Sequence, residues 1–243
     1  MQVNRNALAA FAFAASAAAQ AHQIWIEQPA GGNAVIRFGE YSENLREASP
    51  GLLDKFGKLR ATLVSSRGER QADAAKTATG FNLPFQAVSG ETIVAEDASY
   101  PLYTWKQGER QITNWYRPAA RYITDFKAQQ ARLTLDLVPT GNPGEFKVLF
   151  KGQPLPKAKI SLVVQSGWAK EGHADAQGLV QFDMPWQGTY VAEVSHDDRV
   201  AGERVGAHEA EKFDGISYVT SLTFVKADGL PAVPAGPAAA PSK

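Results

Sequence analysis

Cysteine is absent from the 243 residues of the chain. The sequence therefore excludes disulfides, thiolate metal sites and cysteine nucleophiles, and leaves any site chemistry to histidines, carboxylates, hydroxyls and aromatic rings. The chain also has no net charge, because its 25 Lys and Arg residues balance its 25 Asp and Glu residues. A neutral chain lacks the cationic contacts that hold a phosphate backbone, so we expect no nucleic acid partner.

Long apolar runs are also missing beyond the first residues of the chain. Arg5 opens a stretch in which residues 7–19 are all apolar or small. This stretch is shorter than the ~20 apolar residues that span a bilayer. Residues 19–21 (Ala-Gln-Ala) match the pattern that signal peptidase cleaves. The sequence thus predicts a signal peptide over residues 1–21, a periplasmic protein without stable membrane insertion, and a mature chain that begins at His22.

The rest of the chain has the texture of a β protein. Short runs of Val, Ile, Leu, Phe and Thr alternate with Gly, Pro, Asn and Asp, which favours an all-β fold. We expect strands at 23–27, 34–38, 59–65, 92–96, 132–138, 145–150, 158–165, 179–184, 190–195 and 218–226, and a short helix at 50–56. Strand spacing of ~8–12 residues in the second half is typical of an immunoglobulin-like or prealbumin-like sandwich.

This pattern predicts two β-sandwich domains after the signal peptide. The first covers residues 22–130 and is β-rich. The second covers residues 131–227 and is the immunoglobulin-like or prealbumin-like one. Residues 228–243 are rich in Ala and Pro without any period, so we expect a disordered tail there.

Aromatic residues are dense in one stretch of the first half. They are Tyr100, Tyr103, Trp105, Trp115, Tyr116, Tyr122 and Phe126. Aromatics favour strands and pack well there, so the first interpretation is a β-layer core. A stacking platform for a sugar is the alternative, and it would make the chain a metal-free carbohydrate-binding or adhesion module.

Several short motifs follow one another in an order typical of one family. They are Ala21-His22-Gln23-Ile24-Trp25 at the expected cleavage point, Gly152-Gln153-Pro154-Leu155, Asp175-Ala176-Gln177-Gly178 and Ser221-Leu222-Thr223-Phe224. Together they resemble an exported family of unknown function that is often labelled as the periplasmic component of nickel or cobalt uptake. The resemblance spans nearly the whole mature chain. It implies handling of nickel or cobalt, with a membrane transporter or an outer-membrane receptor as partner.

The four histidines all lie after the expected cleavage point. A histidine at the amino terminus can close a chelate ring through its α-amine and its Nδ1 atom. Both groups lose their protons readily to a metal near neutral pH. Such nitrogen donors suit nickel, cobalt and copper rather than magnesium or calcium. His22 is therefore the first metal-ligand candidate.

Three further residues are candidates to complete the shell. His196 ends an expected strand and precedes Asp197, so it could supply a second imidazole with a carboxylate beside it. His208 lies on the segment Gly202–Phe213, which we expect to be flexible and able to close over a metal, with His208 as a third ligand. His173, before the turn at 175–178, is the weakest candidate. The predicted ligands of a transition metal ion (Ni, Co or Cu) are thus His22, His196, His208 and Asp197.

Signatures of catalysis are lacking. The chain has no G-x-S-x-G elbow, no Gly-rich phosphate loop and no H-E-x-x-H pair. We therefore expect a binding protein that supports metal uptake or homeostasis, and not an enzyme. A copper redox enzyme built on a histidine brace is the enzymatic alternative.

Overall fold

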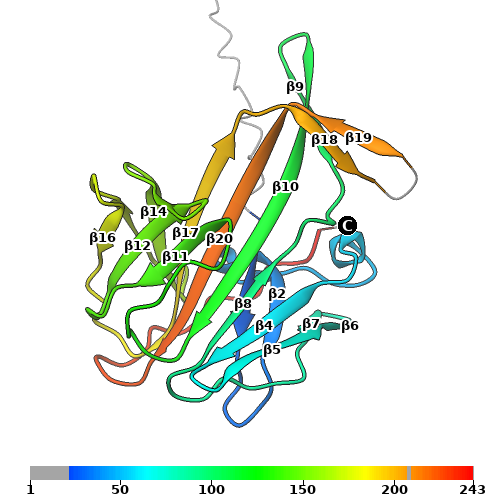
Figure 1. The fold of residues 1–243 in the computed structure, drawn as a ribbon. Helices are drawn as coiled ribbons and strands as arrows, with labels where there is room; N and C mark the ends of the chain where they lie inside the picture. Colours follow the sequence, from blue (N-terminus) through cyan, green and yellow to red (C-terminus); the bar gives the residue numbers. More distant parts are fainter. Residues whose placement is uncertain (1–21, 207–208, 243) are drawn as a thin grey trace, which may run out of the picture.

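A computed structural model describes residues 22–206 and 209–242 of the chain. This part is all-β with several stacked sheets, which confirms the predicted fold class (Figure 1). Its helical segments are two short 3-10 turns, η1 (Tyr41–Glu43) and η2 (Leu52–Lys55), and η2 lies inside the expected helix at 50–56. The expected signal peptide and His208 lie outside the described residues.

A nine-stranded central sheet runs through both halves of the chain. Its strands are β4 (Arg60–Ser65), β5 (Gly68–Asp73), β8 (Thr92–Glu96), β9 (Tyr103–Gln107), β10 (Arg110–Ile123), β14 (Lys159–Val164), β15 (Ala169–His173), β17 (Gly188–Asp198) and β20 (Gly215–Lys226). Their order is β15-β14-β17-β20-β10-β8-β4-β5, and β9 pairs with β10. The long strands β10 and β20 lie side by side at its centre and are parallel, while their other neighbours are antiparallel (Figure 1).

Two smaller sheets pack on the central one. The first contains β1 (Gln23–Glu27), β2 (Val35–Glu40), β3 (Leu45–Arg46), β6 (Ala75–Thr77) and β7 (Gly80–Asn82). The second contains β11 (Leu135–Pro139), β12 (Glu145–Phe150), β13 (Gln153–Pro154) and β16 (Leu179–Gln181). A separate hairpin of β18 (Gly202–Val205) and β19 (Ala210–Phe213) projects at one end (Figure 1).

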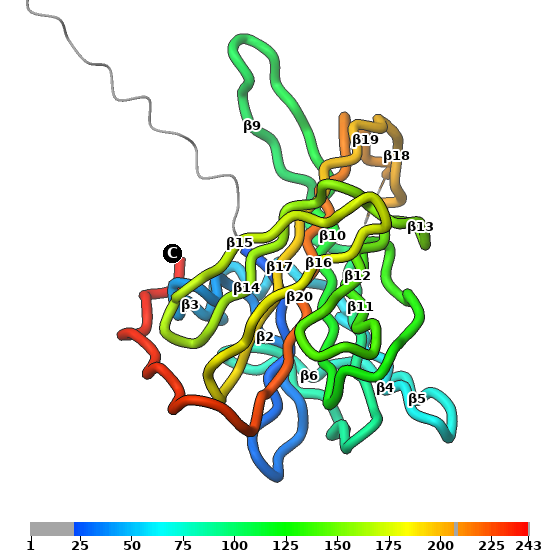
Figure 2. The backbone as a smooth tube through the Cα atoms, turned by 90° about the vertical axis from the view of Figure 1, so that its left-hand side faces the viewer, coloured from blue at the N-terminus to red at the C-terminus, as the bar shows by residue number. Residues whose placement is uncertain are grey.

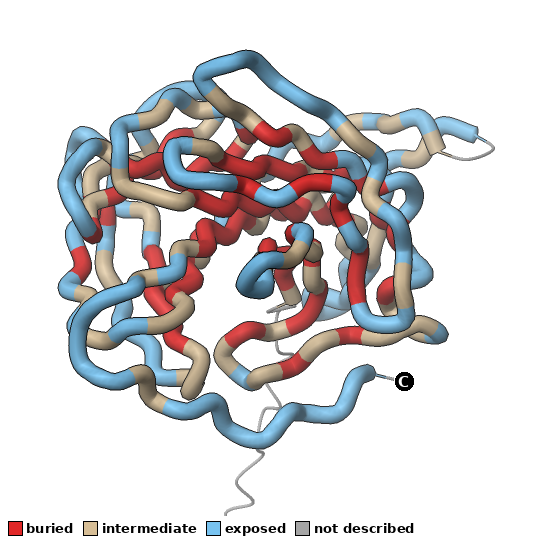
Figure 3. The backbone as a smooth tube through the Cα atoms, turned by 90° about the horizontal axis from the view of Figure 1, so that it is seen from below, coloured by how far each residue is buried: buried red, intermediate tan, exposed pale blue. Residues whose placement is uncertain are grey.

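The two smaller sheets cover opposite faces of the central sheet. Alternate side chains of a strand point to opposite faces, and β20 shows both environments. Tyr218 and Leu222 belong to the core beneath the four-stranded sheet. Val219 packs on the core beneath β1, and Ser221 donates a hydrogen bond to the carbonyl of Ile24. Figure 3 shows the buried residues gathered towards the middle of the molecule, with exposed residues around them.

The expected boundary near residue 130 separates the two cores but not the sheet. One core is built almost entirely from residues before it, and the other mostly from residues after it. The central sheet nevertheless continues from β10 to β20 through ten paired positions, Asn114–Ile123 against Gly215–Phe224. The halves are thus joined by backbone hydrogen bonds and not only by a linker.

Residues 228–242, named the strap below, are the segment for which the sequence predicts a disordered tail. The strap lies in extended form along the molecule, ending near β3 (Figure 2). Most of it is exposed, as Figure 3 shows along the segment that leads to the C-terminus. Side chains from other parts of the chain donate hydrogen bonds to the strap. Gln165 donates to the carbonyl of Val233, and Asn44 donates to the carbonyl of Gly236.

Across the two described ranges, no helix has the length and apolar character needed to cross a membrane.

Candidate metal centre

His22 directly precedes β1 and is held at several points. Ile24, Trp25 and Ile26 are completely buried, so they fix the strand that follows it. The hydroxyl of Tyr116 donates a 2.7 Å hydrogen bond to the His22 carbonyl. The imidazole packs against Phe38, with ring centroids 5.2 Å apart. His22 therefore has a defined position against the first core.

Both ring nitrogens of His22 face carboxylates. Nε2 lies 2.6 Å from Oε1 of Glu47, and Nδ1 lies 3.2 Å from Oε1 of Glu40. The two carboxylates differ in access, since the Glu47 side chain is 0% exposed and that of Glu40 is 25% exposed. Only Glu40 is open to a ligand that arrives from solvent.

A tight connection brings the two glutamates to one histidine. Glu40 ends β2 and Glu47 follows β3, and the two strands are antiparallel around η1. Gly39 makes this possible: its φ is +145°, and an added Cβ would lie 2.3 Å from the carbonyl oxygen of Leu45. Only glycine allows so close an approach of the two strands.

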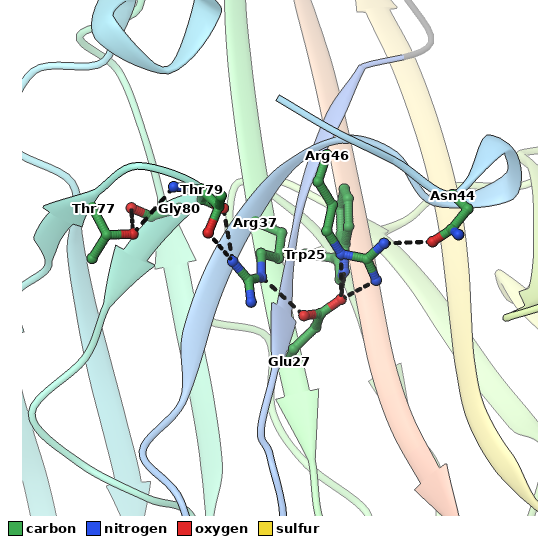
Figure 4. A network of polar contacts seen from close by, with 8 residues as sticks. All are labelled: Trp25, Glu27, Arg37, Asn44, Arg46, Thr77, Thr79 and Gly80. Carbon is green, nitrogen blue, oxygen red and sulfur yellow. Dashed lines mark hydrogen bonds and ion pairs between the residues drawn. The ribbon is translucent and has the colours of Figure 1, made fainter. Parts of the chain in front are cut away.

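The face of the same sheet that carries Trp25 supports this connection. The carboxylate of Glu27 accepts hydrogen bonds from Arg37 (2.9 Å) and Arg46 (2.6 Å), and Arg46 lies over the Trp25 ring (Figure 4). Burial acts to raise the pKa of Glu27, but the charge and hydrogen bond of Arg46 hold it below its usual 4.5. This anchors Arg46, the residue that precedes Glu47.

The buried Glu47 carboxylate obtains its donors from three groups. Besides Nε2 of His22, it accepts from the hydroxyl of Ser242 (2.7 Å) and the backbone amide of Ser242 (3.0 Å). A buried carboxylate requires such partners. Nε2 is thus the ring nitrogen of His22 that contacts Glu47, and Nδ1 lies on the side of Glu40.

A third carboxylate lies close by on β17. Gln23 donates a side-chain hydrogen bond to Glu193. Burial raises the pKa of Glu193 from 4.5 to about 7, the bond from Gln23 lowers it, and repulsion from Glu40 raises it. The surroundings of His22 are therefore acidic in character.

A family model described as a domain of unknown function (DUF4198) matches residues 19–198. The chain belongs to this family. No curated protein sequence matches it. The match covers His22, Glu40 and Glu47 and ends before β20 and the strap.

The structure does not bring the other predicted ligands of this DUF4198 protein to His22. His196 shares its face of β17 with Ala192 and Val194 of the second core, and its ring packs on Phe150 at 4.4 Å. Gln23 and Glu193 meet on the opposite face. His196 and His22 thus lie on different sides of the central sheet.

The remaining candidates also have other positions. Asp197 accepts a 2.7 Å hydrogen bond from Ser217, which in turn accepts from Tyr103 and Asn114. This places Asp197 at the base of the β9 hairpin. His173 is exposed on β15, opposite Lys159. His208 is not among the described residues.

Glu40 and Glu47 are the partners that sequence reasoning missed. The segment Gly39-Glu40-Tyr41-Ser42-Glu43 contains two acids, and nothing in its pattern distinguishes Glu40 from Glu43. The pairing of β2 with β3 is what distinguishes Glu40 from Glu43, because it fixes the position of Glu40. Within the two described ranges, no group of three or more His, Cys, Asp or Glu side chains converges on a metal position. Glu40 and Glu47 fail to converge because they contact opposite nitrogens of one ring.

The aromatic stretch is mainly core. Tyr100, Tyr116 and Tyr122 are buried in the first cluster, which confirms the β-layer interpretation for them. Burial raises the pKa of Tyr100 to about 12. Trp105 is the exception: it is 39% exposed on the β9 hairpin and stacks on Tyr103 with centroids 5.6 Å apart.

Proposed function

We propose that this protein is an exported transition-metal-binding protein in which His22, freed by cleavage after Ala21, binds the ion. The α-amine and Nδ1 of His22 supply two nitrogen ligands, and Glu40 supplies an oxygen. The observation that carries the proposal is the pairing of the two ring nitrogens with two carboxylates, one buried and one accessible.

The different partners of the two ring nitrogens of His22 support this proposal. A metal-binding histidine usually donates its other ring N–H to a carboxylate, which fixes the ring orientation. Glu47 is placed to accept that hydrogen from Nε2 at 2.6 Å. Nδ1 is then the free nitrogen, and it is the one that can close a chelate ring with the α-amine of the same residue.

The distance between Nδ1 and Glu40 fits a shared ion. Nitrogen and oxygen ligands bind first-row ions at ~2.0–2.2 Å, so two adjacent ligands of one ion lie about 3 Å apart. The Oε1 atom of Glu40 lies 3.2 Å from Nδ1. A small movement of Glu40 is enough to place both atoms around one ion, with water completing the shell.

The donor set indicates the class of metal. Amine and imidazole nitrogens select nickel, cobalt, copper or zinc over magnesium and calcium. The resemblance noted in the sequence favours nickel or cobalt, and the ligand chemistry alone favours copper. We infer a role in uptake or homeostasis of such an ion in the periplasm, with a membrane transporter or an outer-membrane receptor as the partner that takes it on.

Calorimetry with Ni(II) and Cu(II) tests the proposal on protein whose first residue is His22. A second preparation carries one additional Ala before His22, which removes the chelating amine. We expect binding at least tenfold weaker in the extended protein and in Glu40→Gln. Glu43→Gln is the matched control, because Glu43 is an exposed acid in the adjacent turn. Equal affinity in the two preparations contradicts the proposal.

One observation favours the metal-free alternative. The exposed Trp105, stacked on Tyr103, offers an aromatic surface on strand β9 of the β9–β10 hairpin. If the protein is a carbohydrate-binding module, we expect glycan binding that survives chelation and is lost in Trp105→Ala.

The copper redox alternative requires a second imidazole beside His22, and His196 lies across the sheet from it.

A further inference from the structure

The strap reaches the candidate metal centre through its residue Ser242. Both the hydroxyl and the backbone amide of Ser242 donate to Glu47, at 2.7 and 3.0 Å. The same Oε1 atom of Glu47 accepts from Ser242 and lies 2.6 Å from Nε2 of His22. One carboxylate therefore joins the far end of the chain to the first strand.

The course of the strap leads to this contact. It leaves the central sheet beyond β20, and the amide of Gln187 donates to the carbonyl of Leu230. It then follows the edge of the first small sheet, where Asn44 donates to Gly236 and Ala239 pairs with Leu45 in a parallel bridge. Leu45 begins β3, the strand that ends directly before Glu47. The strap thus covers the connection that carries the buried carboxylate.

We propose that Ser242 is a positioning residue for His22 that acts through Glu47. With the strap in place, each carboxylate oxygen of Glu47 has a hydrogen-bond donor. These donors hold the carboxylate in the one orientation in which Oε1 faces Nε2 of His22. When the strap is detached, the Glu47 carboxylate gains water as a competing partner and is free to rotate. The imidazole then loses the fixed contact that holds its Nε2 atom and orients the ring.

The consequence for metal binding rests on the proposed function. If the docked strap favours the ring orientation that binds the ion, the ion must favour the docked strap by the same factor, because coupling between two binding events is reciprocal. Outer partners of metal-bound histidines typically change affinity by 10–100-fold. The strap contact is expected to lie in that range.

The first test needs no metal. Nitrogen-15 NMR of the His22 ring in metal-free protein at one fixed pH reports whether the ring is held in one environment. We expect one sharp set of ring signals in the full chain and in Ser242→Thr, which keeps the hydroxyl. Ser242→Ala and a chain that stops after residue 235 are expected to give averaged or exchange-broadened ring signals. Unchanged ring signals in the shortened chain overturn the inference.

The second test adds Ni(II) to the same four proteins. We expect 10–100-fold weaker binding in the shortened chain, an intermediate loss in Ser242→Ala, and slower hydrogen exchange of the Ser242 amide once the ion is bound. Equal affinity in the full and shortened chains overturns the coupling. If none of the proteins binds Ni(II) or Cu(II) while the ring signals still respond to the strap, the positioning role stands and the proposed function fails.

Discussion

Arg121 on β10 and Asp136 on β11 form a buried ion pair across the expected domain boundary. Nε and Nη2 of Arg121 lie 3.0 and 2.6 Å from the two carboxylate oxygens, and both side chains are nearly inaccessible. Asp136 also accepts from the backbone amides of Arg132 and Leu133. This pair fixes the four-stranded sheet and the segment before it to the central sheet.

Asp136→Asn is expected to destabilise the protein strongly. The substitution leaves the Arg121 charge buried without its counterion, which typically costs 3–5 kcal/mol. Chemical denaturation at neutral pH measures the change in the free energy of unfolding. The matched control is Asp73→Asn, which breaks the exposed pair with Arg60 and should change stability by less than ~1 kcal/mol. Similar effects of the two substitutions would contradict this assignment.

Gly39→Ala should disturb both stability and the candidate metal centre. The added Cβ would meet the Leu45 carbonyl oxygen at 2.3 Å, and the backbone there has a positive φ. Strain of this kind costs about 1–3 kcal/mol. The connection that carries Glu40 and Glu47 must then shift, so Ni(II) affinity falls together with the thermal midpoint. Gly90→Ala, where φ is positive but the space is open, is the control: it should leave metal affinity unchanged.

Glu193 should give the protein a pH-dependent stability. Its pKa is raised by burial to about 7 in the folded protein from an ordinary value of 4.5. The folded state therefore favours the protonated acid, so this contribution is complete below pH 4.5 and is lost as the pH rises through 7. Glu193→Gln removes the dependence. We expect nearly equal stabilities of variant and wild type at pH 4.5, and a more stable variant at pH 8, by up to about 3 kcal/mol. A constant difference between the two pH values would refute the assignment.

Glu47→Gln isolates the orienting role of the buried carboxylate. The amide keeps the size of the side chain but loses the negative charge that receives the Nε2 hydrogen of His22. We expect Ni(II) affinity 10–100-fold weaker, in the range for outer partners of metal-bound histidines. Calorimetry on the processed protein measures it, with Glu43→Gln as control. A variant that binds as tightly as wild type would show that Glu47 serves only to hold the strap.

Strand periodicity predicted much of the fold, and its failures have identifiable causes. The strands at 23–27, 92–96 and 145–150 occur as expected, because alternation and turn residues are local signals. β10 was missed because Pro118 and the charged Arg117 and Arg121 interrupt its apolar pattern. Contacts from other segments hold these residues in the sheet: Arg121 binds Asp136, Arg117 donates to Glu96, and the Pro118 carbonyl accepts from the amide of Asp97.

The candidate metal centre could also be predicted only in part from the sequence. His22 could be selected from its place after the expected cleavage point, which is a local feature of the sequence. Its carboxylate partners depend on the pairing of β2 with β3 and on the return of the strap, which no short motif encodes. His196 was predicted as a ligand because it lies at the end of a strand. Its position in the alternation of side chains decides which face of the sheet it lies on, and the end of a strand alone does not specify that face.

The parallel pairing of β10 with β20 has a consequence for how the chain acquires its structure. About 90 residues separate the two strands, and β20 is the last strand of the sheet. As the chain emerges from the ribosome, the middle of the sheet must stay open until β20 is available. Contacts of such long sequence separation slow folding. The edges of β10 and β17 that face β20 thus stay unpaired until the last part of the sheet has been made.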